Sequence, residues 1–567
     1  MTTPQEELTT VHQALHGYAD GHRLLASSID VGREASGLMV VLSDMSGPTM
    51  IPGFESYLTG YALSEDLYVV ARTWYAPEMP RPGCVWTHSL LFSSIDLGRV
   101  QDLRTLPNVF RRPRENSDSD YRQPLHLSLS TRTTSPSFVR RKDAAQLIST
   151  VYGEDERPVF VLSDNSNLYE ALVLSLWAQQ WPALKQTFSF CTGSLALRKL
   201  HDDPLDVQVI PASRSARFER SSPDGMFLDP KDMDEVDSPS WVSEAAADVV
   251  DRGTDIRGFM WEHAHGIETR RGAFRRLASA YVRWMDVLGG HASAASLVDE
   301  LGTLFPAVSE ATELKRFLLD RSPHVPEEAL LEGLVRTQHS AAFDAEELGI
   351  KDRAKALWTT NQPSIETLIL QLAGKRKISP VAEALLRGAA EAIRPRDAMR
   401  LAARRPVVMP ALVSRNLSLA KSPAIWAGDG SGQKLVLDTL ARGRLSRRDR
   451  RSIVGAMVRS GNAELPANLI SSLGGEAITW ILEWLNSPGT FEELPQHWTK
   501  TLQGNTSELV TWFERASKLE PSVAATLAKL LDPLSPTVQH RGTEPWLKAL
   551  KRHRADRELP TWSEVLV

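Results

Sequence analysis

Three histidines near the start of the sequence are the first residues whose type and spacing could support chemistry. His12 and His16 lie four residues apart in a run of alternating polarity, and His22 follows a predicted turn at Asp20-Gly21. Strand alternation puts His12 and His16 on one face, and the turn would bring His22 there too, so the imidazoles could ligate a metal. No acidic residue or cysteine stands at a ligand-like spacing beside them, so we expect no metal site. We expect the histidines instead to hydrogen-bond backbone groups and lock the hairpin.

A second candidate is an anion-binding group on two neighbouring strands. Arg72 and the segment Thr87-His88-Ser89 carry a guanidinium, an imidazole and two hydroxyls. They could hold a phosphate or a nucleotide, with Trp74 or Trp86 as a stacking face. If the two strands form a hairpin, Arg72 lies opposite His88 and Trp74 lies opposite Trp86. The structural alternative, which we favour, is that Arg72 stacks on Trp86 or pairs with an acidic neighbour inside the sheet.

Together these groups define one candidate ligand site in the first part of the chain. Its members, all on or beside predicted strands, are His16, Tyr18, His22, Arg72, Thr87 and His88. A nucleotide or phosphate sensor, or an enzyme, would need these side chains to converge on one pocket.

Signatures of nucleophilic catalysis and of nucleotide hydrolysis are missing from the sequence. Cys84 and Cys191 lie in apolar, strand-like runs, which indicates buried inert thiols, and there is no G-x-S-x-G motif. The run at 428–435 superficially resembles a phosphate-binding loop, but Gln433 interrupts it and no hydroxyl residue follows Lys434. We interpret it as a flexible connection between helices. We expect no catalytic residue and no cofactor, and we favour a protein that is not an enzyme.

Two arginine clusters could contact acidic surfaces. Residues 442–451 contain six arginines, and residues 270–276 contain four. Such runs bind phosphate backbones or acidic proteins, but aromatic residues that would stack on bases are limited to Phe274. The default is a solvated helical face with acidic neighbours in the same chain; docking of a protein comes second and nucleic acid third. The residues predicted to bind a protein partner are Arg444, Arg447, Arg448 and Arg451.

The elements that must position these residues differ between the two parts of the chain. The expected elements of the first part are strands 54–63, 67–75, 84–93, 158–163, 187–192 and 206–210, and helices 96–109, 143–152 and 167–180. From about residue 241, helical periods dominate without a repeat of fixed length. We predict an α+β N-terminal domain with antiparallel hairpins, followed by a large all-α C-terminal region that is solenoid-like or irregular.

Length and composition suggest how this chain of 567 residues divides. We predict an α+β domain at 1–212, a charged linker or exposed loop at 213–240, a helical middle domain at 241–427 and a helical C-terminal domain at 428–567.

Bulk properties exclude several classes of protein. The net charge of −5 gives no basic excess for a nucleic-acid binder, and two cysteines cannot build a disulfide scaffold or a Cys-rich zinc module. The polar start lacks the apolar core of a signal peptide, and no apolar run approaches the length of about 20 residues that spans a bilayer. We therefore expect a cytoplasmic protein with no membrane partner.

One family resemblance covers roughly residues 10 to 195. Residues 13–28, with the pattern Q-x-L-H-G-Y-x-x-G-H-R-L-L-A-x-S, resemble the N-terminal domain of the bacterial GTPase-associated protein family. Residues 81–90 (R-P-G-C-V-W-T-H-S-L) and 188–192 (F-S-F-C-T) resemble further blocks of it. The resemblance implies a component of multi-gene bacterial conflict, or immunity, systems that works beside a P-loop GTPase or related NTPase. It supplies no catalytic residues.

From these observations we predict a non-enzymatic adaptor or scaffold. Its helical region would pair with a GTPase or NTPase encoded nearby. The alternative is an N-terminal domain that senses a nucleotide or phosphate ligand, or acts as an enzyme, through His16, His22, Arg72 and His88.

Overall fold

The computed structural model forms two compact units, Met1–His324 and Val325–Val567, which we describe separately. It describes residues 8–531 except for 101–102, 104–105, 115–117, 129–138, 230, 232–237, 252–254, 321–324, 429, 489–493, 517–518, 521–522, 524–525 and 528–529. The N-terminal mixed sheet followed by a large helical region confirms the predicted fold class. The finer division into four segments stays a prediction.

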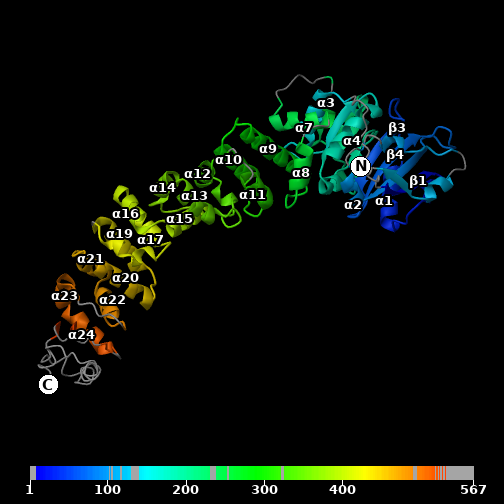
Figure 1. Cartoon of the computed structure of the whole chain (residues 1–567). Helices are drawn as coiled ribbons and strands as arrows, with labels where there is room; N and C mark the ends of the chain where they lie inside the picture. The colour runs from blue at the N-terminus through cyan, green and yellow to red at the C-terminus, as the bar shows by residue number, and fades with distance from the viewer. Residues whose placement is uncertain are drawn as a thin grey trace, which may run out of the picture. The chain divides into compact units, whose positions relative to one another are not determined.

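The first unit is built around a mixed sheet (Figure 1). Its strand order is β12-β7-β11-β8-β3-β4-β5-β1-β2, and β6 pairs with β1. The strands are β1 (Leu8–Tyr18), β2 (His22–Ser27), β3 (Ser56–Ala62), β4 (Leu67–Tyr75), β5 (Val85–Ser93), β6 (Leu125–Ser128), β7 (Val159–Ser163), β8 (Phe190–Cys191), β11 (Val207–Pro211) and β12 (Met226–Leu228). The short strands β9 (Lys199–Leu200) and β10 (Asp203–Pro204) pair separately. Strands β1 to β5 are antiparallel to their neighbours, whereas β7, β8, β11 and β12 are joined by parallel pairings.

The predicted hairpins have the expected turns and register. Asp20 and Gly21 both have positive φ, at 56° and 127°, as a tight turn between β1 and β2 requires. The pairing of β4 with β5 puts Arg72 opposite His88 and Trp74 opposite Trp86, which confirms the predicted register.

Some predicted elements of the first unit were wrong in extent. The helix expected at 96–109 is divided into α2 (Ser94–Arg99) and a 3₁₀ turn at Leu106–Asn108, because the backbone is extended at Val100 and ends α2 there. The strand expected at 187–192 shrinks to β8, since α5 (Pro182–Thr187) begins at a proline suited to a first helical turn. The stretch 213–240, expected as a linker or exposed loop, includes α6 (Ser215–Ser221) and β12, which pairs with β7.

Helices complete the first unit and share its core. They are α1 (Arg33–Ser43), α3 (Arg141–Val151), α4 (Glu170–Gln179), α7 (Ser240–Asp251), α8 (Ile256–His263), α9 (Arg271–Leu288), α10 (Ala294–Leu304) and α11 (Thr312–Asp320). Tyr152, after α3, stacks on Phe274 of α9 with ring centroids 3.9 Å apart. The buried Lys185 of α5 donates to the Val100 carbonyl and lies 4.2 Å from the Trp261 ring on α8. These contacts join helices that follow the sheet in sequence to the sheet domain itself.

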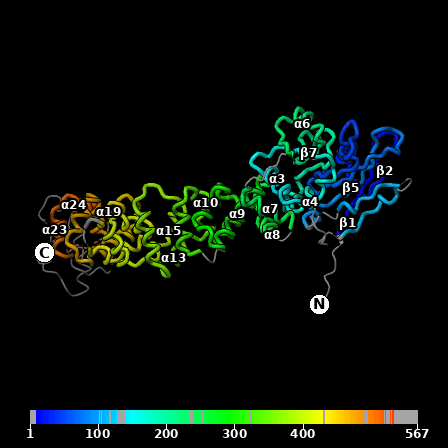
Figure 2. Tube along the Cα trace, turned by 90° about the horizontal axis from the view of Figure 1, so that it is seen from above, coloured from blue at the N-terminus to red at the C-terminus, as the bar shows by residue number. Residues whose placement is uncertain are grey.

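The second unit is a stack of helical pairs in chain order (Figure 2). Its helices are α12 (Glu327–Arg336), α13 (Ile350–Thr360), α14 (Gln362–Leu372), α15 (Pro380–Ala392), α16 (Pro395–Arg404), α17 (Val408–Val413), α18 (Pro423–Trp426), α19 (Gly430–Arg442), α20 (Arg447–Arg459), α21 (Leu465–Leu473), α22 (Gly475–Leu485), α23 (Gln496–Gln503) and α24 (Thr506–Arg515). The helices α12, α14, α16, α19, α21 and α23 begin 31 to 35 residues apart. This structural repeat is the hallmark of stacked helix pairs, and it makes the region solenoid-like.

Polar contacts between successive pairs follow the same spacing. Glu366 of α14 accepts from Arg400, 34 residues later, and Glu383 of α15 accepts from Arg415, 32 residues later. Glu483 of α22 accepts from Arg450, 33 residues earlier. Each ion pair therefore links one helical pair to the next.

The start of α19 corrects one sequence interpretation. Residues 430–434 are the first turns of this helix and not a connection between helices. The Gln433 side chain donates to the Gly428 carbonyl, and Asn462 donates to the same carbonyl. These bonds hold the segment to its neighbours in the stack.

Gly388 marks a close crossing of α13 and α15 and gives a test of the stack. A Cβ atom there would overlap the carbonyl oxygen of Lys351 and lie 3.0 Å from the Cβ of Ala354. We expect Gly388→Ala to lower the free energy of unfolding by about 1–3 kcal/mol, because both neighbours are helical and cannot move cheaply. Thermal unfolding followed by circular dichroism measures it. The matched control is Gly432→Ala in α19, where nothing lies within 4 Å of the new methyl group, and it should stabilise by up to about 1 kcal/mol. Equal stability of the two variants would contradict the close crossing.

Candidate functional site

The sheet of the first unit does not bring the six predicted ligand residues into one site. On β1 and β5, His16 lies opposite Thr87, while the preceding residue of β1 lies opposite His88. Because neighbouring residues of a strand point to opposite faces, Thr87 and His88 lie on opposite faces of the sheet. Arg72 lies opposite His88 and shares its face. One face carries His16, Tyr18, His22 and Thr87, and the other carries Arg72 and His88.

Arg72 is engaged with an acidic neighbour, as the structural alternative predicted. Its Nη2 lies 2.9 Å from Oε1 of Glu170 at the start of α4, its Nη1 reaches Oε2 at 3.2 Å, and its Nε donates to the Ser56 hydroxyl. Burial raises the pKa of Glu170 to about 7, and the charge of Arg72 works against that rise. The guanidinium therefore fastens α4 to the sheet.

His88 is held on both ring nitrogens. The backbone N–H of Arg111 donates to Nδ1 at 3.1 Å, so the other nitrogen, Nε2, carries the proton and donates to Oε1 of Gln13 at 2.9 Å. The rings of Phe110 and Tyr121 lie edge-on to the imidazole. Burial, with the nearby charge of Arg111, lowers the pKa of His88 to about 3. This neutral histidine fixes the segment around Arg111 to the sheet.

The opposite face holds a pair of histidines. The rings of His16 and His22 stack with centroids 6.1 Å apart, and Nε2 of His22 lies 2.9 Å from the Ser43 hydroxyl at the end of α1. His16 is fully buried, and neither of its ring nitrogens has a partner among the residues that the structure describes. Burial and the neighbouring His22 lower the pKa of His16 to about 3. The ring of Tyr18, on the same face, lies 5.5 Å from the Arg81 guanidinium.

Thr87 lies on the same face as the histidine pair, and its hydroxyl is hydrogen-bonded within the chain. The Thr87 hydroxyl donates to the Ser43 carbonyl at 2.5 Å and lies 2.9 Å from the Thr73 hydroxyl, so it has partners within the chain. Within the described part of the chain, no group of three histidine, cysteine or acidic side chains is placed to hold a metal ion. His16 and His22 thus stay a predicted ligand position, which does not include Arg72 and His88 because they lie on the opposite face.

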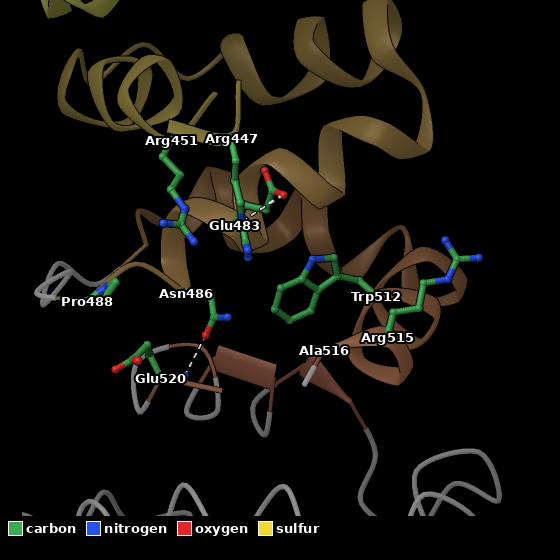
Figure 3. Close-up of a pocket in the computed structure, with 9 residues that line it drawn as sticks. All are labelled: Arg447, Arg451, Glu483, Asn486, Pro488, Trp512, Arg515, Ala516 and Glu520. Carbon is green, nitrogen blue, oxygen red and sulfur yellow. Dashed lines mark hydrogen bonds and ion pairs between the residues drawn. The ribbon is translucent and has the colours of Figure 1, made fainter. Parts of the chain in front are cut away.

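The second unit contains a pocket of about 450 Å³ between α20, α22 and α24 (Figure 3). Its lining residues are Arg447, Arg451, Glu483, Asn486, Pro488, Trp512, Arg515, Ala516 and Glu520. Two of the four arginines predicted to bind a partner, Arg447 and Arg451, therefore line a cavity. The other two, Arg444 and Arg448, are exposed nearby in sequence.

Positive charge exceeds negative charge at this pocket. The Glu483 carboxylate lies 3.3 Å from Nε of Arg447 and accepts two bonds of 3.0 Å from Arg450. Arg451, one helical turn from Arg447, is the third guanidinium around this carboxylate, and its Nε is buried without a partner in the described structure. Burial and the charge of Arg447 lower the pKa of Arg451, while Glu483 opposes that shift. An anion bound in this pocket would neutralise part of the excess positive charge.

The walls of the pocket come from distant parts of the sequence. The Trp512 indole faces the centre of the pocket from α24, with Asn486 on the opposite side (Figure 3). Oδ1 of Asn486 accepts from the backbone N–H of Glu520 at 2.7 Å, which orients the amide. Sequence reasoning missed these walls, because the arginine cluster was the only local signal.

The other arginine cluster is engaged within the first unit. Arg271 lies 3.2 Å from Asp206, Arg275 lies 2.8 Å from Glu154, and Arg276 pairs with Glu310. The default prediction for this cluster, acidic partners in the same chain, fits these ion pairs. Of the cysteines, Cys191 is buried and Cys84 is half-buried.

The fold and these sites define a class of protein with a mixed-sheet N-terminal domain and a stack of helical pairs. Residues 10–110 match the family described as GTPase-associated protein 1, N-terminal domain type 1. This match confirms the family resemblance for that segment, which contains β2 to β5 and all but the first two residues of β1; the block at 188–192 lies outside it. No curated protein and no solved structure matches the chain. Among the residues that the structure describes, no helix is both long and apolar enough to cross a membrane.

Proposed function

We propose that the chain is a non-enzymatic adaptor of a bacterial conflict system that pairs, through its helical region, with a P-loop GTPase or NTPase encoded nearby. The observation that carries this proposal is the stack of helical pairs with its repeat of 31 to 35 residues. Such stacks present extended surfaces, which helical-repeat proteins use to bind other proteins. The match of residues 10–110 to a GTPase-associated domain supports the choice of partner. The adaptor would act in the reducing cytoplasm, which suits its free cysteines.

The alternative, a nucleotide or phosphate sensor or enzyme in the N-terminal domain, receives less support. It requires His16, His22, Arg72 and His88 to share one pocket. Arg72 is bonded to Glu170 and His88 to Gln13, on the face of the sheet opposite His16. Of these four residues, His16 and His22 stack on each other, and His16 is fully buried.

Co-expression of the full chain with the NTPase from the adjacent gene tests the adaptor proposal. We expect the two proteins to co-purify and to elute together on size exclusion, whereas an unrelated P-loop NTPase should not. A chain that stays monomeric beside the neighbouring NTPase would overturn the proposal.

Charge reversal in the exposed part of the arginine cluster gives a sharper form of this test. The double variant Arg444→Glu, Arg448→Glu should weaken the complex by about tenfold at low salt, because surface charges mainly steer association. The matched control is Arg217→Glu, Arg220→Glu on α6, which are also exposed arginines. Surface plasmon resonance at two salt concentrations measures both. Equal losses in the two double variants would show that the effect is only one of net charge.

A further inference from the structure

We propose that the pocket between α20, α22 and α24 holds a carboxylate from an acidic segment of the protein partner, with an aromatic side chain of that segment against Trp512. This inference rests on the proposed adaptor function and names the chemistry that the partner must present. It differs from a general role of the arginine cluster, since it assigns one pocket to a carboxylate and an aromatic side chain of the partner.

The first argument is the missing acceptor at Arg451. Arg447 and Arg450 both bond to Glu483, whereas Nε of Arg451 is buried with no acceptor in the described structure. A buried donor without an acceptor is unfavourable. A carboxylate in the pocket would accept from the guanidinium of Arg451, which lines it, with the planar geometry that a guanidinium binds best.

The second argument is the form of the pocket. Arg451 and Asn486 stand on one side of it, and the Trp512 indole stands across from them (Figure 3). Because Oδ1 of Asn486 is bonded to the N–H of Glu520, the amide nitrogen is turned toward the Trp512 side (Figure 3). Guanidinium and amide donors beside an indole suit a carboxylate next to a flat apolar group. The volume of about 450 Å³ accommodates two side chains more readily than one small anion.

The third argument favours an acidic protein segment over an isolated anion as the occupant of the pocket. Arg444 and Arg448 are exposed within seven residues of Arg451, so the positive surface continues outside the pocket. The whole chain carries a net charge of −5, so this surface is a local feature and not a consequence of a basic protein. Several carboxylates along one segment would use both the pocket and the surface around it.

The test is fluorescence anisotropy of the full chain with a fluorescein-labelled peptide that carries two aspartates on each side of one phenylalanine. We expect binding that Arg451→Gln and Trp512→Ala each weaken by about tenfold, equivalent to ~1.4 kcal/mol. Arg459→Gln, an exposed arginine on the same helix outside the pocket, is the matched control and should change affinity by less than about twofold. A peptide with asparagines in place of the aspartates should not bind. Helix content and melting temperature of each variant verify that the stack is intact.

Other results would overturn the inference. Equal affinity of the peptide for the parent chain and for Arg451→Gln would show that the pocket does not bind the peptide. Binding of inorganic phosphate, GTP or a short RNA by a chain that does not bind the peptide would make the pocket a small-anion or nucleic-acid site.

The pocket and the adaptor proposals can fail separately. If the peptide binds through Arg451 but the neighbouring NTPase does not co-purify, only the adaptor proposal fails. If the NTPase co-purifies equally well with Arg451→Gln and with the parent chain, only the pocket inference fails.

Discussion

Arg72→Ala is expected to lower the free energy of unfolding of the first unit by about 3–5 kcal/mol, because it leaves a buried carboxylate without its partner. The side chains of Arg72 and Glu170 are only 13% and 10% exposed, and three N–O contacts of 2.9–3.2 Å join them. Burial already raises the pKa of Glu170 to about 7 in the presence of the guanidinium. Without Arg72 the carboxyl group must take up a proton or stay charged in a poorly solvated place, and both cost stability at neutral pH.

Two controls distinguish this ion pair from general damage to the sheet. Arg72→Met combined with Glu170→Leu removes both charges at similar volume, and it should recover most of the loss. The loss in Arg72→Ala should also shrink between pH 7.5 and pH 5, because protonation of Glu170 removes the unpaired charge. Urea unfolding followed by tryptophan fluorescence measures these differences. A single variant within about 1 kcal/mol of the parent chain would contradict a structural role for the pair.

The hairpin register could be predicted from sequence because it depends on local signals. Alternation gave the face of each residue along β4 and β5, and one connection between them fixed which residues lie opposite. The positive φ of Asp20 and Gly21 follows from their residue types in the same way. The placement of Arg72 opposite His88 therefore follows from the order of residues along the two strands and the turn that joins them.

The division of the candidate ligand site between two faces could not be predicted. It depends on the pairing of β1 with β5, strands separated by about 70 residues, and a shift of one residue would reverse the result. Likewise, Glu170 lies 98 residues from Arg72, so only the tertiary fold identifies it as the acidic partner. The sequence showed that such a partner was plausible but not which residue it was.

The repeat of the helical region was hidden by its uneven second helices. The segment between α16 and α19 contains two short helices, α17 and α18, where other pairs contain one longer helix. The ion pairs that join successive helical pairs, such as Glu366 with Arg400, give no periodic signal in the sequence, because glutamate and arginine are also common on surfaces. The pocket was missed for a related reason, since Trp512 lies 61 residues from Arg451 and only the stack brings them together.

Acidification should destabilise the first unit through two buried histidines. The pKa of His16 and of His88 is lowered to about 3 from 6.5, so the unfolded chain binds these protons first. Their contribution to stability is complete above pH 6.5 and is lost as the pH falls toward 3. Between pH 7.5 and pH 5 each should lose about 2 kcal/mol. Glu170, with its pKa raised to about 7, acts in the opposite direction over this range and offsets roughly half of the total.

Single substitutions distinguish the effect of His88 on the pH dependence of stability from the opposite effect of Glu170. His88→Gln should reduce the loss of stability on acidification by about 2 kcal/mol, and Glu170→Gln should increase it by a similar amount. Urea unfolding at pH 7.5, 6 and 5 measures the slopes. If His88→Gln keeps the slope of the parent chain, His88 binds its proton equally well in the folded and unfolded states. The bonds that His88 makes with Gln13 and Arg111 would then not hold a neutral imidazole.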